Sequence, residues 1–181
     1  MKNILHILFI LLICQPLLAQ NKQTPPVAKA KGVNWISLEE AQVRMKTEPR
    51  KVYIDLYTDW CGWCKVMDKK TFSHAKVIEF MNEHYYCIHL NAESKDTLVF
   101  NGEKFGILEG SNTNALAMDW MQNRLSYPTS IFFDENFLNP QPIPGYLEVP
   151  TMEMILKYIA GNFHKNTPWP KWQKEFKGEW K

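Results

Sequence analysis

A hydrophobic segment that runs almost directly into a Cys-x-x-Cys motif constrains the fold of this 181-residue chain more than any other feature. Residues 52–57 (VYIDLY) are mostly apolar, β-branched or aromatic over strand length, which is typical of a buried central strand. Cys61 and Cys64 follow after three residues. Apolar positions at helical spacing across 65–81 predict that the cysteines open a helix, with a kink near Ser73. The sequence therefore predicts a strand, turn and helix with two thiols at the turn.

The remaining elements predict a mixed sheet with helices on both of its faces. Capping residues, periodicity and turn residues indicate helices over 38–46, 113–125 and 152–159, strands over 85–90, 130–133 and 145–149, and a turn over 136–142. Residues 98–110 stay unassigned. This order predicts an α/β fold with a central mixed β-sheet flanked by helices, and it places the cysteine pair at the sheet edge where binding sites form.

The N-terminus has the pattern of a signal peptide, which we expect over residues 1–19. A flexible linker over 20–34, one domain over 35–162 and a basic, aromatic tail over 163–181 should follow. Cys14 leaves lipid anchoring open as an alternative, but Ile13 is bulky where lipid attachment sites have a small residue. We therefore expect an exported protein, located in the periplasm of a bacterium.

Composition and spacing disfavour several other classes of function. A formal net charge of +2 is too small for a nucleic-acid-binding surface. A zinc site would need a second ligand pair, and His74 and His84 would lie too far along the helix, so we expect no metal. Cys87 lies in an apolar strand and is expected in the core. A purely structural role for the Cys61–Cys64 pair is weak, because so short a loop constrains the unfolded chain little.

The position of the cysteine pair at a helix N-terminus predicts a redox function. Unpaired N–H groups and the positive end of the helix dipole stabilise a thiolate, so Cys61 is the expected nucleophile. Cys64, one turn further on, would be more buried and would resolve the mixed disulfide. Lys65 could add positive potential, although a solvated lysine is the simpler interpretation.

Residues 52–65 (VYIDLYTDWCGWCK) resemble the active-site strand and turn of the thioredoxin family. The resemblance implies that Asp55 is a buried carboxylate that helps to deprotonate Cys64. Residues 126–129 (SYPT), just before a core strand, are similar to the family's proline loop, which implies a cis bond before Pro128. The expected substrate-binding residues are Trp60, Gly62, Trp63, Tyr127, Pro128 and Thr129.

Three features depart from that family's usual pattern. Trp63 stands where many thioredoxins have proline, which leaves the direction of electron flow open. His89 stands where a lysine often neighbours the buried acid, so His89 and Asp55 together could tune Cys64; an exposed strand histidine is the alternative. The segment 92–112 is longer than in the family, and it could cover the site or be a plain surface loop.

The sequence thus predicts a thioredoxin-like thiol-disulfide oxidoreductase, most simply a reductase of protein disulfides that serves cell redox homeostasis. It would need no dissociable cofactor beyond the Cys61–Cys64 pair, and another dithiol protein would supply electrons. The resemblance implies that this donor could be embedded in a membrane. The alternative is a thioredoxin-fold module that binds partners with little or no redox turnover. The tail could touch a membrane or partner, or Trp169 and Trp172 could pack on the domain.

Overall fold

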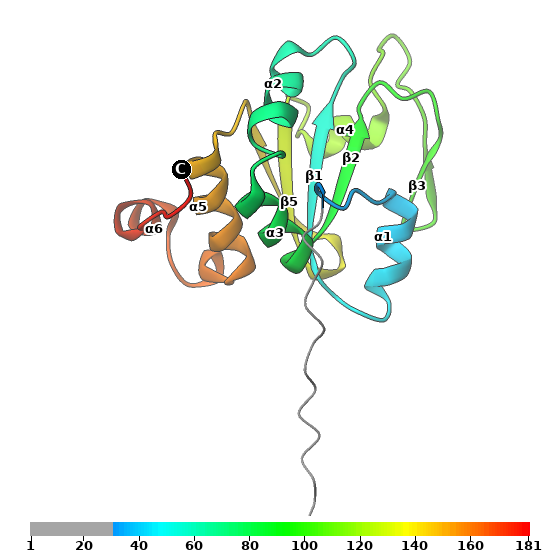
Figure 1. The fold of residues 1–181 in the computed structure, drawn as a ribbon. Helices are drawn as coiled ribbons and strands as arrows, with labels where there is room; N and C mark the ends of the chain where they lie inside the picture. Colours follow the sequence, from blue (N-terminus) through cyan, green and yellow to red (C-terminus); the bar gives the residue numbers. More distant parts are fainter. Residues whose placement is uncertain (1–30) are drawn as a thin grey trace, which may run out of the picture.

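The computed structural model describes residues 31–181, which form a four-stranded sheet between two layers of helices (Figure 1). The expected signal peptide, Cys14 and residues 20–30 of the expected linker lie outside the described residues. Within 31–181, no helix combines the length and apolar character that crossing a membrane requires.

The helices and strands follow one another in an order close to the predicted one. In chain order they are α1 (Leu38–Met45), β1 (Lys51–Tyr57), α2 (Gly62–Lys70), α3 (Ala75–His84), β2 (Tyr85–Asn91), β3 (Leu98–Phe100), β4 (Glu103–Phe105), α4 (Ala115–Trp120), β5 (Thr129–Asp134), the short 3-10 helix η1 (Glu135–Phe137), β6 (Leu138–Pro144), α5 (Val149–Ala160), the 3-10 helix η2 (Phe163–Lys165) and α6 (Trp169–Glu175).

The main sheet is mixed, as predicted, with the strand order β2-β1-β5-β6. Strand β1 pairs in parallel with β2 and antiparallel with β5, and β6 pairs antiparallel with β5. The first six residues of β1 are buried, which agrees with a strand that has neighbours on both edges and helices on both faces.

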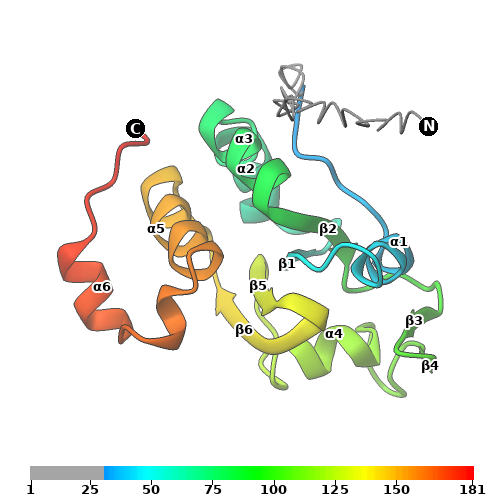
Figure 2. The same cartoon turned by 90° about the horizontal axis from the view of Figure 1, so that it is seen from below.

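Two hydrophobic cores lie on opposite faces of this sheet. One core joins α1 and α4 to β1, β2 and β5, and the other joins α2, α3 and α5 to the same strands (Figure 2). Alternate side chains of each strand enter opposite cores, because successive side chains of a strand point to opposite faces. Helix α2 is therefore held at one end of β1, where the cysteine pair was predicted.

The single kinked helix predicted after the cysteines is wrong, because α2 and α3 are separate helices. Residues 71–74 lie between the end of α2 and the start of α3. Within this break, the Thr71 hydroxyl donates to the Leu147 carbonyl at 2.7 Å, and Phe72 is buried in the core. These tertiary contacts stabilise a bent chain that the apolar spacing alone does not reveal.

The predicted turn over 136–142 and strand over 145–149 are also wrong, since β6 covers Leu138–Pro144 and the chain turns at Gly145, where φ is 97°. The prolines that suggested a turn are tolerated because β6 is an edge strand. Helix α4 is shorter than predicted and ends before Gln122 and Asn123, both at positive φ. The unassigned residues 98–110 contain the hairpin of β3 and β4, which turns at 101–102.

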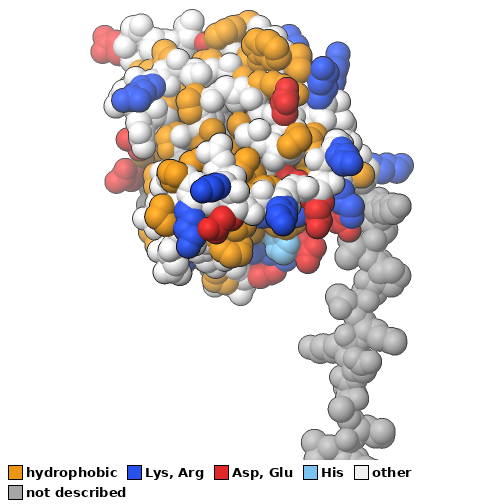
Figure 3. Space-filling model, turned by 90° about the vertical axis from the view of Figure 1, so that its left-hand side faces the viewer, with side chains coloured by type: hydrophobic (Ala, Val, Ile, Leu, Met, Phe, Trp, Pro, Cys, Tyr) orange, Lys and Arg blue, Asp and Glu red, His pale blue; other side chains and the backbone are white. Residues whose placement is uncertain are grey.

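The tail packs onto the domain rather than extending away from it. Trp169 and Trp172 are partly buried against the core of α3 and α5, and Trp180 is buried there. The fully buried Glu153 carboxylate accepts the backbone N–H groups of Glu179 and Trp180, each at 2.9 Å. Seen from the side of α6, lysines and apolar side chains are interspersed on the surface (Figure 3).

Candidate active site

Cys61 and Cys64 form a disulfide at the start of α2. Cys61 is the N-cap residue of the helix, and its Sγ accepts the backbone N–H of Cys64 at 3.0 Å. The two cysteines are almost equally buried, at 4% and 3% exposed, so burial does not separate their roles. The cap position does, because a thiolate on Cys61 would gain from this N–H group and from the helix dipole.

Two exposed tryptophans precede the two cysteines in the sequence, Trp60 before Cys61 and Trp63 before Cys64, and a tyrosine contacts each of them. Trp60 is 66% exposed and packs edge-on against Tyr127 at 5.8 Å between ring centroids. Trp63 is 61% exposed and stacks on Tyr146 at 5.5 Å. Exposed apolar side chains that lie close together mark interaction sites, and tryptophan is a frequent anchor in binding interfaces.

The predicted proline loop is present, and the Tyr127–Pro128 peptide bond is cis. The Trp60–Tyr127 contact joins this loop to the cysteine turn. The Pro128 carbonyl accepts the N–H of Gly145 at 2.8 Å. Thr129 is buried, and its hydroxyl donates to the Ser126 carbonyl at 2.8 Å, so that side chain serves the loop itself.

Asp55 lies in the middle of β1 directly opposite His89 of β2. The Nε2 atom of His89 is 3.2 Å from Oδ2 of Asp55, which is ion-pair distance for a protonated imidazole, but the geometry is not that of a well-directed hydrogen bond. Asp55 is only 1% exposed, and its Oδ1 atom has no hydrogen-bond partner among residues 31–181. Burial raises the pKa of Asp55, because water no longer solvates its charge, and this effect outweighs the opposing effect of His89.

The His89 ring lies between two aromatic side chains. Its centroid is 4.0 Å from that of Tyr57 and 5.1 Å from that of Trp35, with both neighbouring rings tilted by about 30°. Such contacts restrict rotation of the imidazole and keep one nitrogen directed at Asp55. The exposed strand histidine, the simpler alternative, therefore does not describe His89, whose side chain is 26% exposed.

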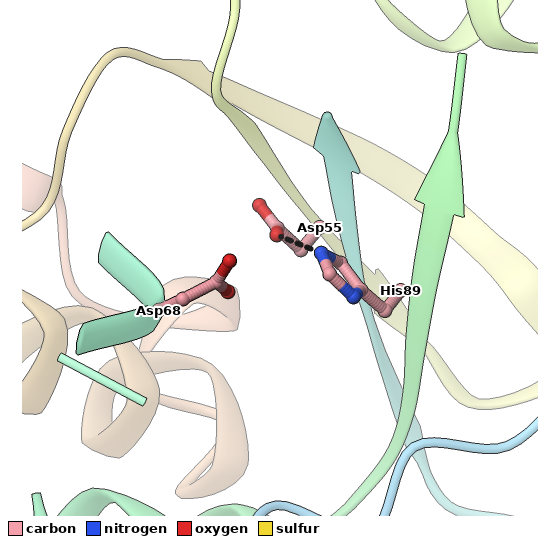
Figure 4. Close-up of side chains that lie close together, drawn as sticks. All are labelled: Asp55, Asp68 and His89. Carbon is pink, nitrogen blue, oxygen red and sulfur yellow. Dashed lines mark ion pairs between the residues drawn. The ribbon is translucent and has the colours of Figure 1, made fainter. Parts of the chain in front are cut away.

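Asp68 of α2 approaches the same pair from the helix side (Figure 4). The ligand-type atoms of Asp55, Asp68 and His89 all lie within 4.8 Å of one another. Two carboxylates and an imidazole are donors that a divalent cation can use. Burial raises the pKa of Asp55 and so opposes the charge that a metal ligand would carry, and Asp68 is exposed, so we assign no metal to this cluster.

Sequence reasoning brought several of these residues together and missed others. Trp35, Tyr57 and Tyr146 carried no signal, because their roles depend on contacts between distant segments. Asp68 could have been found one helical turn after Cys64.

Glu93 was missed inside the long segment 92–112, where it accepts the indole N–H of Trp60 at 3.0 Å. This bond links the segment to the cysteine turn. Lys65, by contrast, is exposed and has no ion-pair partner within residues 31–181. Gly62 is exposed as well, and a Cβ added there would meet open space.

Comparisons with known proteins agree with this geometry. Thiol:disulfide interchange protein DsbD of Vibrio cholerae is 36% identical over 86 residues, which are 42% of this chain and 14% of that protein. DsbD of Actinobacillus pleuropneumoniae is 30% identical over 115 residues, which are 62% of this chain and 17% of that protein. The chain thus spans less than a fifth of the length of these curated relatives.

Two solved structures share the fold. A thioredoxin-fold protein from Helicobacter pylori has a TM-score of 0.53 at 12% identity, covering 76% of this chain and 92% of that one. A candidate disulphide-isomerase from Bacteroides thetaiotaomicron has a TM-score of 0.50 at 21% identity, covering 72% and 95%. The model of the family described as "Thioredox_DsbH: Protein of unknown function, DUF255" matches residues 17–168. Because this match covers most of the chain, the protein belongs to the Thioredox_DsbH family of thioredoxin-like proteins.

Proposed function

We propose that this protein is an exported thiol-disulfide oxidoreductase that reduces disulfides of other proteins. One observation carries the proposal: the Sγ of Cys61 caps α2 and is bonded to Cys64, and Cys61 lies between the exposed residues Trp60 and Trp63 in the sequence. A sulfur in that position is a good nucleophile and a good leaving group, since its thiolate is stabilised. The similarity to the thiol:disulfide interchange protein DsbD supports the same chemistry.

The proposed reaction transfers two electrons from the dithiol to a substrate disulfide. The Cys61 thiolate attacks one substrate sulfur, which breaks the substrate S–S bond, forms a mixed disulfide and releases one substrate thiolate. Cys64 then loses its thiol proton to the Asp55 carboxylate and attacks the Cys61 sulfur. This step releases the second substrate thiolate and leaves the Cys61–Cys64 disulfide.

Substrates would bind across the exposed surface beside the disulfide. We assign Trp60, Trp63, Tyr127 and Pro128 to this contact, because aromatic anchors next to the reacting sulfurs would hold a polypeptide in place. A second dithiol protein in the exported compartment would return the two electrons, and the family resemblance implies that this donor could be embedded in a membrane.

A trapping experiment tests the proposed function. The Cys64→Ser variant should accumulate proteins covalently attached to Cys61, because the second attack is lost. A reducing agent should cleave these mixed disulfides and release the attached proteins. Cys61→Ser is the matched control, and it should trap nothing. Equal recovery of the same partners with the intact pair and with both variants would instead indicate a binding module.

The direction of electron flow is tested by the midpoint potential of the Cys61–Cys64 pair in defined thiol-disulfide buffers. A value near about −270 mV agrees with the proposed reductase, whereas one near about −120 mV is that of an oxidant and would contradict it.

A further inference from the structure

We propose that His89 is a proton relay between the solvent and the buried carboxyl group of Asp55. The inference rests on the proposed function, because the relay is needed only if Asp55 takes the proton of Cys64 during turnover. It goes beyond tuning of a thiol by charge, since it assigns to the two ring nitrogens of His89 two different tasks.

The need for a relay follows from the burial of Asp55. The residue is 1% exposed in the central strand β1, so its carboxyl group cannot exchange protons with bulk water directly. A proton received there during one half of the cycle would have to leave through a neighbouring group. Within residues 31–181, His89 is the one basic side chain at ion-pair distance from this carboxylate.

The His89 side chain reaches from that carboxylate to the surface. Its Nε2 atom is buried, 3.2 Å from Oδ2 of Asp55, and has no hydrogen-bond partner in the part of the chain that the structure describes. The side chain as a whole is 26% exposed. Figure 4 shows Nε2 turned to Asp55 and the second ring nitrogen turned away from it. An imidazole can accept a proton at one nitrogen and release one from the other.

The surroundings of the ring suit this task. Tyr57 and Trp35 cover the ring and limit its rotation, so the nitrogens keep their separate directions. The charged or titratable groups that face it are Asp55 and Tyr57 of β1 and Asp68 of α2. The exposed Asp68 carboxylate would favour the transient imidazolium by charge attraction.

The proton movements balance over one complete cycle. When Cys64 attacks Cys61, its proton passes to Asp55 and then to Nε2 of His89, and Nδ1 releases a proton to the solvent. The ring then carries hydrogen on Nε2. When the donor dithiol reduces the disulfide, Nδ1 takes a proton from the solvent, and Nε2 returns one through Asp55 to the Cys64 thiolate. The original tautomer is restored without a ring flip.

Rapid mixing of the reduced protein with an aromatic disulfide that releases a coloured thiolate tests the relay. The first release reports attack by Cys61, and the second reports attack by Cys64. His89→Ala should leave the first release unchanged and slow the second by about a hundredfold or more, within the range of lost acid-base catalysis. Added imidazole should restore the second rate, because the space between the aromatic rings is then vacant.

Three further variants separate the relay from charge and packing. His89→Phe keeps the aromatic stack but has no nitrogen, so it should be slow and insensitive to imidazole. His89→Lys keeps a cation and should also be slow, and a wild-type rate would show that charge suffices. His84→Ala is the matched control and should change neither release, since the His84 side chain is 39% exposed and its ring lies tilted against Phe80, with centroids 4.2 Å apart.

The two proposals fail in different ways. If the first release is absent in the wild type, Cys61 is not a nucleophile and the proposed function fails. If both releases occur and His89→Ala leaves the second one at the wild-type rate, the proposed function stands and the relay is overturned. Unfolding curves of each variant show that slow release does not come from loss of the fold.

Discussion

Substitution of Asp55 by asparagine should stabilise the folded protein at neutral and alkaline pH. The pKa of Asp55 is raised by burial above its ordinary value of 3.8, so ionisation is more costly in the folded state than in the unfolded state. The stability that the neutral carboxyl contributes is complete below pH 3.8 and is lost as the pH rises through the folded pKa. Each pH unit in that window lowers the free energy of unfolding by up to about 1.4 kcal/mol.

Asparagine cannot ionise, so the advantage of Asp55→Asn over the wild type should grow with pH across this window and then stay constant. Urea unfolding of the oxidised protein between pH 4 and about pH 8 measures the difference, in a range where most proteins stay soluble.

Asp134 provides a control of opposite sign. It is buried at the far end of the sheet, and although burial opposes its charge, the ion pair with Lys51 and the hydrogen bond from Asn139 lower its pKa from 3.8 to about 2. This difference corresponds to about 2 kcal/mol of stability that is present above pH 3.8 and is lost as the pH falls through about 2.

Asp134→Asn should therefore destabilise the protein at neutral pH by about 2 kcal/mol, whereas Asp55→Asn should stabilise it. If Asp55→Asn were less stable than the wild type at pH 8, the contribution of His89 to the charged carboxylate would exceed the cost of burial. That result would refute the reasoning on Asp55.

Three further outcomes follow from burial and position. Glu153→Gln should expose the tail to proteolysis and lower the free energy of unfolding by about 1–3 kcal/mol, because the backbone N–H of Trp180 loses a charged acceptor. The control variant Glu175→Gln changes an exposed residue of α6 and should have neither effect. Cys87 should resist alkylation until the protein unfolds, since burial raises the pKa of its thiol strongly; mass spectrometry counts the modified cysteines. In the reduced protein, Cys61 should be alkylated at a lower pH than cysteines of ordinary thiol pKa, as a titration with iodoacetamide would show.

The sequence determined those features that depend on neighbouring residues. The apolar run 52–57 predicts a buried strand, and a cysteine pair next to a helix start predicts a thiolate at an N-cap, because backbone geometry and N–H groups act locally. The mixed sheet followed from the order of the elements. The proline loop was found by its resemblance to a known family, and its cis bond is present at Pro128.

Only the tertiary structure decided which distant side chains meet. The register of β1 on β2 sets Asp55 opposite His89, and a shift by one residue would turn His89 to the other face of the sheet. Prolines on an edge strand look like a turn in the sequence, because the absence of a neighbouring strand cannot be read locally. The site thus depends on strand pairing and on packing between segments far apart in the chain, which no local pattern of residues specifies.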